Sequence, residues 1–287
     1  MSTVHTVNQS VGQLAREHPG LEKVGRFGWA AKGVVYAIAG ALALLIAVRA
    51  AGWSNDPSTG TEEASPTGAL KTVAHGAGGP VLLALLGLGM LTYAAWRVIS
   101  AFLPSDGSAK AWVKRIGYLV SAVLYGFLAV TAFSIMRSKA PEAKNGNTSV
   151  SHASGGLMAH TGGRLLIGVV GVIVIAAGVY RLVKGFKLDV EDELGLNGVS
   201  PTRRRWTERI GAVGEVGRGV GIGLIGFFLL RAAITYDPNK ATGLDGALRT
   251  LATNTAGLIL VVVVGIGFLA YGVFCLTTFT HRRLQGP

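Results

Sequence analysis

The chain has 287 residues, of which 50% are hydrophobic and only 15% are charged. Because charged residues make up about 25% of ordinary soluble domains, the composition argues against a soluble globular protein. A net charge of +12 would suit a nucleic-acid-binding protein, but basic loops on the cytoplasmic side of a membrane explain the same excess. We therefore expect no nucleic-acid partner. The single cysteine, Cys275, excludes a disulfide framework within one chain.

Six apolar runs are long enough to cross a bilayer, whose hydrocarbon core requires about 20 residues of helix. In chain order, the predicted spans are residues 27–49, 80–101, 114–136, 163–184, 210–233 and 255–279. Backbone groups in lipid must be hydrogen-bonded within each segment, and the runs do not alternate, so we expect helices. The predicted fold class is all-α, an integral membrane bundle of six transmembrane helices.

An internal repeat organises these spans. The phrase Gly68-Ala-Leu-Lys-Thr recurs as Gly246-Ala-Leu-Arg-Thr, in a register that also matches Tyr93 with Tyr271. A register that persists through long apolar runs indicates duplication. We predict three parallel two-helix repeats with the same in–out–in topology, forming a three-fold pseudosymmetric bundle. A cytoplasmic N-terminal segment at 1–23 precedes the repeats, which cover residues 24–103, 112–187 and 206–280.

The segments outside the spans carry weaker signals. Where the Gly-Ala-Leu phrase occurs, we expect a short amphipathic helix on the outer interface that leads into the next span. The stretches 53–67 and 139–156 are rich in Ser, Thr, Gly and Asn and are predicted to be loops. Near the N-terminus, apolar residues at helical spacing predict a short surface helix that ends at Pro19.

Lys and Arg are distributed unevenly. With a cytoplasmic N-terminus, roughly two-thirds of the 27 basic residues lie on the cytoplasmic side. This bias predicts that both termini are cytoplasmic and that anionic lipid is bound at that face. The loop 184–209 is the longest on this side and combines acidic residues with Arg203-Arg-Arg205. Its basic end can lie on anionic lipid. The loop is also our candidate docking site for a membrane-protein partner.

Glu215 and Arg218 are the most informative charged residues. They lie three residues apart near the start of the fifth span, so they can pair on one helix face. If the helix begins near Ile210, Glu215 lies about 8 Å along it. An ionisable side chain there could hold an ion, a proton or a lipid head group. The alternative is an interfacial pair whose arginine reaches the cytoplasmic surface. Trp29 matches Glu215 in the first repeat, which argues against a symmetric ion path.

Two arginines occupy equivalent ends of the second and fourth spans. Arg97 follows Trp96, and Arg181 follows Tyr180. We interpret these pairs as interfacial anchors, with the ring at head-group level and the cation on phosphate.

Glycines of the fifth span form two Gly-x-x-x-Gly pairs, Gly217 with Gly221 and Gly219 with Gly223. Small residues four apart allow helix backbones to approach closely. The pairs therefore predict close packing within the bundle or, alternatively, self-association through that face.

No pattern in the sequence indicates a metal, cofactor or catalytic site. The six histidines form no His-x-x-x-His pair, and neither Cys-x-x-Cys nor a phosphate loop is present. His75, His152 and His160 could share a metal if three outer loops met, but solvated loop residues are the simpler interpretation. We expect no metal, no cofactor and no enzymatic activity.

Several motifs together resemble one known family. They are Arg26-x-Gly before the first span, Lys32-Gly-Val-Val-Tyr36 within it, the Gly-Ala-Leu phrase, and Tyr93-Ala-Ala-Trp-Arg97 closing the second span. This pattern resembles an uncharacterised bacterial membrane family, domain of unknown function 1206, which is common in actinobacteria. The resemblance implies a six-helix protein of the bacterial cytoplasmic membrane with no assigned activity. It supplies no catalytic or binding residues.

Two functions are compatible with this sequence. The first is a non-enzymatic protein that is structural or accessory to a membrane complex or to lipid organisation. The second is a small channel or transporter for an ion or small solute, with a path along the bundle axis. That path would need converging polar groups, for which Glu215, Arg218 and scattered hydroxyls such as Thr92, Ser121 and Thr131 are available.

Overall fold

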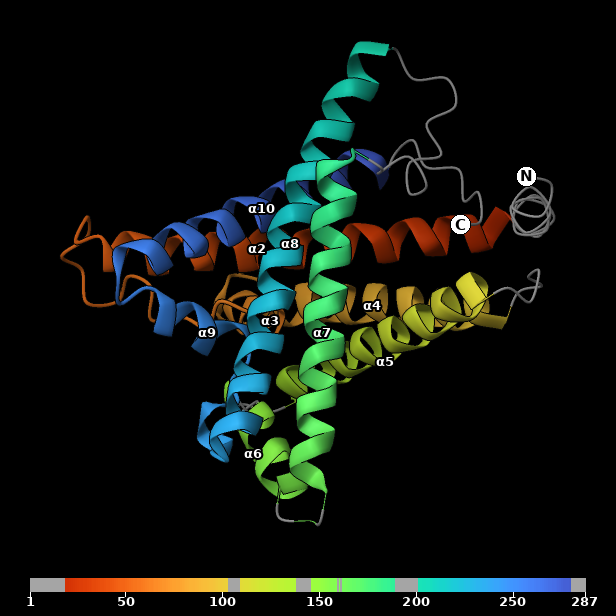
Figure 1. The fold of residues 1–287 in the computed structure, drawn as a ribbon. Coiled ribbons are helices and arrows are strands. Elements are labelled where there is room, and N and C mark those ends of the chain that lie inside the picture. Colours follow the sequence, from red (N-terminus) through yellow and green to blue (C-terminus); the bar gives the residue numbers. More distant parts are fainter. Residues whose placement is uncertain are drawn as a thin grey trace.

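Six long helices dominate the computed structural model. It describes residues 19–102, 109–137, 146–158, 160, 162–188 and 201–279, so the predicted surface helix before Pro19 lies outside the described residues. All six long helices have the length and hydropathy to cross a membrane. They are α2 (Pro19–Ala50), α4 (Gly79–Phe102), α5 (Ala109–Arg137), α7 (Gly163–Phe186), α8 (Pro201–Thr235) and α10 (Thr255–Phe279) (Figure 1). Each predicted span lies within one of them, and no strand occurs in the described ranges, so the predicted all-α membrane bundle is confirmed.

Short helices connect the long ones. They are α3 (Pro66–His75), α6 (Gly146–Met158), the 3-10 helix η2 (Pro238–Lys240) and α9 (Leu244–Leu251). Ser65 caps α3, because its side chain accepts a hydrogen bond from the Gly68 amide at 3.0 Å. The Gly-Ala-Leu phrase does form helices, but Leu70 of α3 and Leu248 of α9 are completely buried. Both short helices therefore pack their apolar sides into the core, and each leads into the next long helix as expected. Most of α6 also falls where the sequence predicted a loop.

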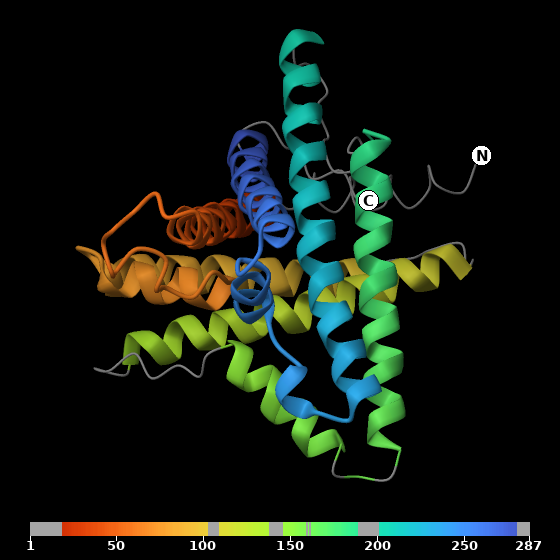
Figure 2. The ribbon, with the colours of Figure 1, turned by 60° about the vertical axis from the view of Figure 1, so that its left-hand side comes forward.

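The long helices pack in an order that differs from their order in the chain. α2 and α10 form the central pair. α4 packs on α2 and α8 on α10, while α5 lies on α4 and α7 on α8. Figures 1 and 2 show that α7 and α8 run side by side and cross α4 and α5 steeply. The two long helices of the second repeat therefore belong to opposite ends of the arrangement, and the expected three-fold bundle is not formed.

The contacts of the connecting helices follow the same division. α3 packs against both long helices of the first repeat, and α9 packs against both of the third. The second repeat lacks the Gly-Ala-Leu phrase, and its connecting helix, α6, packs on α7, η2 and α9. No connecting helix packs between α5 and α7 in the described residues. Instead, α5 lies on α4 of the first repeat and α7 lies on α8 of the third.

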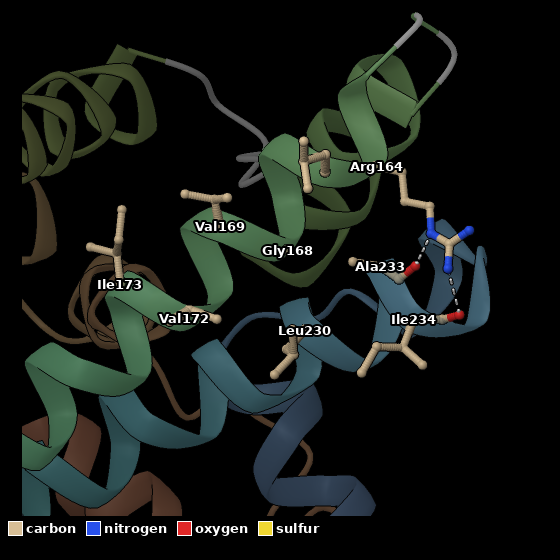
Figure 3. Close-up of a pocket in the computed structure, with 9 residues that line it drawn as sticks. Arg164, Gly168, Val169, Val172, Ile173, Leu230, Ala233 and Ile234 are labelled. Atoms are coloured by element: carbon tan, nitrogen blue, oxygen red, sulfur yellow. Dashed lines mark hydrogen bonds between the residues drawn. The ribbon is translucent and has the colours of Figure 1, made fainter.

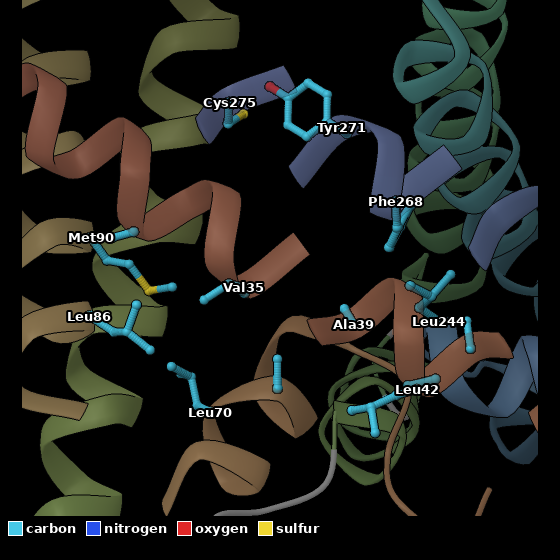
Figure 4. Close-up of a cluster of buried hydrophobic side chains, with 14 of the residues drawn as sticks. Val35, Ala39, Leu42, Leu70, Leu86, Met90, Leu244, Phe268, Tyr271 and Cys275 are labelled. Carbon is cyan, nitrogen blue, oxygen red and sulfur yellow. The ribbon is translucent and has the colours of Figure 1, made fainter. Parts of the chain in front are cut away.

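The core centres on α2, α4 and α10. Leu70 of α3 and Met90 of α4 lie beside Val35 of α2, while Phe268 of α10 lies nearer Leu244 of α9 (Figure 4). By contrast, the outer faces of α5 and α7 expose large apolar side chains. Apolar surfaces of this extent on membrane-length helices are lipid contacts, so the bilayer is a partner of this protein.

The glycines of α8 lie at its interfaces with three neighbouring helices. A Cβ atom on Gly217 would lie 2.5 Å from the Gly267 Cα of α10, and one on Gly219 would lie 2.8 Å from the Gly178 carbonyl oxygen of α7. Gly221 is near Leu244 and Phe268, and the Gly223 backbone adjoins Gly178. These glycines let backbones approach within the chain.

Candidate functional site

Glu215 lies at the centre of a buried ion-pair network. Its carboxylate is completely buried and accepts hydrogen bonds from Arg218 of the same helix and from Arg181 of α7, both at 2.8 Å. α8 begins at Pro201 and not near Ile210, so Glu215 lies about 21 Å along the helix, farther from its first residue than expected. Two cations therefore neutralise a carboxylate well inside a membrane-length helix.

Arg218 extends this network towards the centre of the molecule. Its guanidinium lies 4.0 Å from the ring centroid of Tyr271 on α10 and 5.2 Å from that of Tyr36 on α2. Such stacking is favourable because ring faces carry negative charge density. The side chain is buried, and its Nε donor has no hydrogen-bond partner among the described residues. The alternative interpretation required Arg218 to reach the cytoplasmic surface, but this buried side chain does not reach it.

Lys32 is a second buried cation, and it is surrounded by aromatic rings. Its side chain is only 2% exposed. The ammonium nitrogen lies 4.5–5.4 Å from four ring centroids, which belong to Trp29, Tyr93, Tyr125 and Tyr271. These rings come from α2, α4, α5 and α10. In the part of the chain that the structure describes, no carboxylate is bound to Lys32.

Tyr93 links Lys32 to a third cation, Arg97. The Tyr93 hydroxyl oxygen accepts hydrogen bonds from Lys32 Nζ at 3.2 Å, from Arg97 Nε at 2.9 Å and from Arg97 Nη2 at 2.6 Å. The Arg97 guanidinium also lies about 5 Å from the rings of Tyr93 and Tyr118. One phenolic oxygen thus receives three N–H groups from two cations.

These groups form one continuous assembly, which we call the cation–tyrosine cluster. Its charged members are four cations and one carboxylate, and its rings are four tyrosines contributed by helices of all three repeats. Such a cluster can join helices, attract an anion, or bind and release a proton. The members are Lys32, Tyr36, Tyr93, Arg97, Tyr125, Arg181, Glu215, Arg218 and Tyr271.

The structure places the predicted anchor residues in two different environments. Tyr180 is 68% exposed on the lipid-facing side of α7, and Trp96 is partly exposed. The two arginines differ from our expectation, because Arg97 binds Tyr93 and Arg181 binds Glu215. The acceptor of Arg97 lies one helical turn away on the same helix, and the acceptor of Arg181 lies on the adjacent helix. The two arginines therefore belong to the cluster, and their role as interfacial anchors stays a prediction.

Sequence reasoning did not assign Lys32, Tyr36, Tyr93 and Tyr271 to a site. A signal was available, because three of them belong to the motifs of the resemblance and Tyr93 matches Tyr271 across the repeat. Trp29, Lys32 and Tyr36 are also spaced so that they share one helix face. The repeat motif therefore marks positions that face the same buried cluster.

The candidate docking loop 184–209 is only partly described. Residues 189–200 lie outside the described residues, and from Pro201 onwards the chain is the first part of α8. Arg205 and Trp206 are exposed there, and Arg204 pairs with Glu208 at 2.7 Å. The basic end of the predicted loop is thus a helical surface.

Two further features lie away from the cluster. Asp245 of α9 accepts a hydrogen bond from the Ala64 amide at 2.9 Å, while Arg249 donates to the Gly60 carbonyl at 2.9 Å. The third repeat thereby holds a loop of the first. An open apolar groove of about 600 Å³ lies between α7 and α8, and at its polar end Arg164 donates to the Ala233 carbonyl at 2.8 Å (Figure 3). No group of three metal-ligating side chains occurs among the described residues.

Comparisons with known proteins agree with this architecture. A family model described as Domain of Unknown Function (DUF1206) matches three times, at residues 27–103, 116–187 and 213–278. These matches coincide with the three predicted repeats. The uncharacterized protein YxxB of Bacillus subtilis (strain 168) is 29% identical over 269 residues, which is 93% of each chain. No solved structure matches the chain.

Proposed function

Since the chain belongs to the DUF1206 family, whose description assigns no activity, we propose a function from its own residues: a non-enzymatic structural or accessory protein of the bacterial cytoplasmic membrane. The cation–tyrosine cluster carries this proposal. Its contacts join α7 to α8, α8 to α2 and α10, and α2 to α4 and α5. A cluster built from all three repeats favours a scaffold that holds one shape.

The state of Glu215 supports a structural role. Each of its carboxylate oxygens is bound by a different arginine, Arg181 or Arg218, so the group is fixed and compensated. Removing one partner of such a buried pair typically costs about 3–5 kcal/mol, because the remaining charge is left uncompensated. A side chain held in this way is better suited to joining helices than to passing an ion along a path.

The surface of α8 supports an accessory role at the cytoplasmic face. Arg205 and Trp206 are exposed beyond the predicted span, where the cation can lie on lipid phosphate and the ring at head-group level. Each such cation contributes about 1 kcal/mol of attraction to anionic lipid. We propose that both termini are cytoplasmic and that this end of α8, with the preceding segment, binds anionic lipid and a membrane-protein partner.

The partner proposal is tested by affinity purification from native membranes in mild detergent. We expect a stoichiometric protein to co-purify with the wild type and to be reduced for Arg205→Glu. The matched control is Arg231→Glu, which is also exposed but lies at the opposite end of α8. A clean monomer or homo-oligomer from native membranes would contradict the accessory role.

The orientation is tested separately by labelling single cysteines in intact cells, in a Cys275→Ser background. A membrane-impermeant reagent should label Ser58→Cys in the loop after α2 and leave Arg205→Cys unlabelled until the cells are opened. The reverse pattern would show that the termini lie outside.

Transport of a small ion is the second candidate function, and one observation favours it. Among the described residues, the cluster sets two buried cations, Lys32 and Arg218, and two partly exposed cations against one carboxylate, and such positive charge would attract an anion. In proteoliposomes, the wild type should then support anion or proton flux that Lys32→Met abolishes. Flux equal to that of empty liposomes would exclude this candidate.

A further inference from the structure

The apolar groove between α7 and α8 begins where the close packing of these two helices ends. Gly171 and Gly178, seven residues apart on α7, lie so near α8 that a Cβ atom on either would come within 2.8–2.9 Å of its backbone. At Gly168, the nearest atom to such a Cβ would be the Ala233 Cβ, at 3.6 Å, which is an ordinary contact distance. The helices therefore separate towards the start of α7 and the end of α8, and apolar side chains of both line the space between them.

Arg164 lies at the end of this groove. It precedes Gly171 by seven residues and so continues the same face of α7. Its Nε donates to the Ala233 carbonyl at 2.8 Å, and its Nη2 donates to the Ile234 carbonyl at 3.3 Å (Figure 3). These carbonyl groups belong to the last turn of α8, which ends at Thr235, so Arg164 caps that helix.

The cap leaves part of the guanidinium available to a ligand. An arginine side chain has five N–H groups, and the two contacts use two of them. In the part of the chain that the structure describes, no carboxylate binds Arg164 and no group accepts a hydrogen bond from its Nη1. The side chain is exposed. A fixed cation with unused donors therefore lies at one end of an apolar groove, where it is complementary to an anion.

The length of the groove corresponds to one leaflet of a bilayer. Ile173, at the far end of the lining on α7, follows Arg164 by nine residues, which is about 14 Å of helix. The hydrocarbon core of a bilayer is about 30 Å thick, so one leaflet contributes about 15 Å. The groove holds about 600 Å³, and Arg164 is the charged residue of its lining. Its shape therefore suits an acyl chain that runs from the head-group region to the middle of the bilayer.

Tyr236 marks the same end of the groove as the head-group level. Its ring centroid lies 5.6 Å from the Arg164 guanidinium, and the residue is 64% exposed. Exposed tyrosines gather at membrane–water interfaces, because the ring is apolar and the hydroxyl is polar. The groove itself opens on two helices of membrane length, where lipid is the surrounding medium.

We propose that this groove binds one phospholipid with an anionic head group. The acyl chain lies between Val172 and Leu230, and the phosphate accepts charge-assisted hydrogen bonds from Arg164. With cytoplasmic termini, this lipid belongs to the outer leaflet, opposite the basic end of α8 at Arg205. The site depends on neither the orientation nor the proposed function, since a scaffold or a transporter can hold such a lipid.

The proposal is tested by photocrosslinking in nanodiscs of phosphatidylcholine. The purified full-length protein receives a small fraction of phosphatidylglycerol that carries a diazirine in one acyl chain, and adducts are mapped by peptide mass spectrometry. We expect adducts around Val172 and Leu230 to be several-fold more frequent than around Val123, which is 72% exposed on α5. Phosphatidylcholine with the same chain should give about five-fold fewer groove adducts, the factor expected for one cation at an anionic lipid.

Two glycine variants separate occupation of the groove from a general change in the protein. Gly168→Leu fills the groove, and its Cβ makes only an ordinary contact with Ala233, so the groove adducts should fall several-fold for both lipids. The matched control is Gly126→Leu on α5, where a Cβ meets nothing within 4 Å. It also places a leucine in a long helix and should leave the groove adducts unchanged.

The head-group contact is tested at Arg164. Arg164→Gln should make the groove adducts of the two lipids nearly equal, and Arg164→Lys, which keeps the charge, should restore most of the preference for phosphatidylglycerol. An unchanged preference in Arg164→Gln would overturn the proposal.

Two further results would also overturn it. One is groove adducts no more frequent than those on α5. The other is a dimer in native mass spectrometry that Gly168→Leu dissociates, because a second copy of the chain would then occupy the groove.

Discussion

Arg181 of the second repeat binds Glu215 of the third through a 2.8 Å ion pair. Arg181 is partly exposed and Glu215 is buried, so the ion pair joins the edge of the molecule to its centre. The contact also fixes α7 on α8, where Gly178 and Gly219 let the two backbones approach. Packing and electrostatics therefore act on the same interface.

Loss of Arg181 should destabilise the protein through the charge that remains. In Arg181→Gln, Glu215 keeps only Arg218, and we expect the free energy of unfolding in detergent to fall by about 1–3 kcal/mol. The double variant Arg181→Gln/Glu215→Gln should lose less than the sum of the single losses, because the two residues interact. Arg205→Gln, an exposed control, should change little. Strictly additive losses would show that the pair is not coupled.

Two glycines of α8 should respond in opposite ways to a methyl group. Gly217→Ala places Cβ 2.5 Å from the Gly267 Cα, and we expect a loss of about 1–3 kcal/mol from forced separation of α8 and α10. At Gly223 the same atom meets nothing within 4 Å, so Gly223→Ala should be neutral or slightly stabilising, since alanine favours helix. Thermal unfolding of both variants in one detergent makes the comparison; equal melting temperatures would contradict the close approach.

Arg249 should hold the loop of the first repeat in place. It donates to the carbonyl groups of Gly60 and Glu62, so Arg249→Met should free this loop. Limited proteolysis should then cleave the loop before Pro66 several-fold faster than in the wild type. Lys240→Met removes an exposed pair of 3.8 Å, worth about 0–1 kcal/mol, and serves as the control. Unchanged cleavage in Arg249→Met would mean that Asp245 holds the loop alone.

Asp56 should make the same loop sensitive to acid. Hydrogen bonds from the Ser58 amide and hydroxyl lower the pKa of the Asp56 carboxyl from its usual range. A lowered folded-state pKa stabilises the loop above the unfolded-state pKa of about 3.9 and loses this effect as pH falls through the folded value. Hydrogen exchange at Ser58 should therefore be faster in Asp56→Asn at neutral pH, and the difference should vanish in acid. A difference that persists below both pKa values would contradict this cause.

The six long helices were predictable because each depends on a local property. A run of about 20 apolar residues can cross a bilayer only as a helix, whatever its neighbours are. The pairing of Glu215 with Arg218 was predictable for the same reason, since residues three apart meet on one helix. α6 was missed because Ser, Asn and Gly between Gly146 and Gly156 favour a loop when they are considered locally.

The contacts between helices were not predictable. Arg181 binds Glu215 because α7 packs on α8, and Lys32 reaches the Tyr93 hydroxyl because α2 packs on α4. A Lys–Tyr motif on α2 gives no indication that its ring partners lie on α4, α5 and α10. The repeat pattern suggested three equal hairpins, and the chain instead divides the middle one.

This division has a consequence for synthesis in the cell. Rings from α4 and α5 reach Lys32 as soon as the first half of the chain has been inserted, but Tyr271 belongs to α10, the last long helix. Until α10 arrives, a charged lysine in the first membrane helix faces lipid or water on one side. The nascent protein must therefore leave one side of Lys32 uncovered throughout translation, until α10 packs against it.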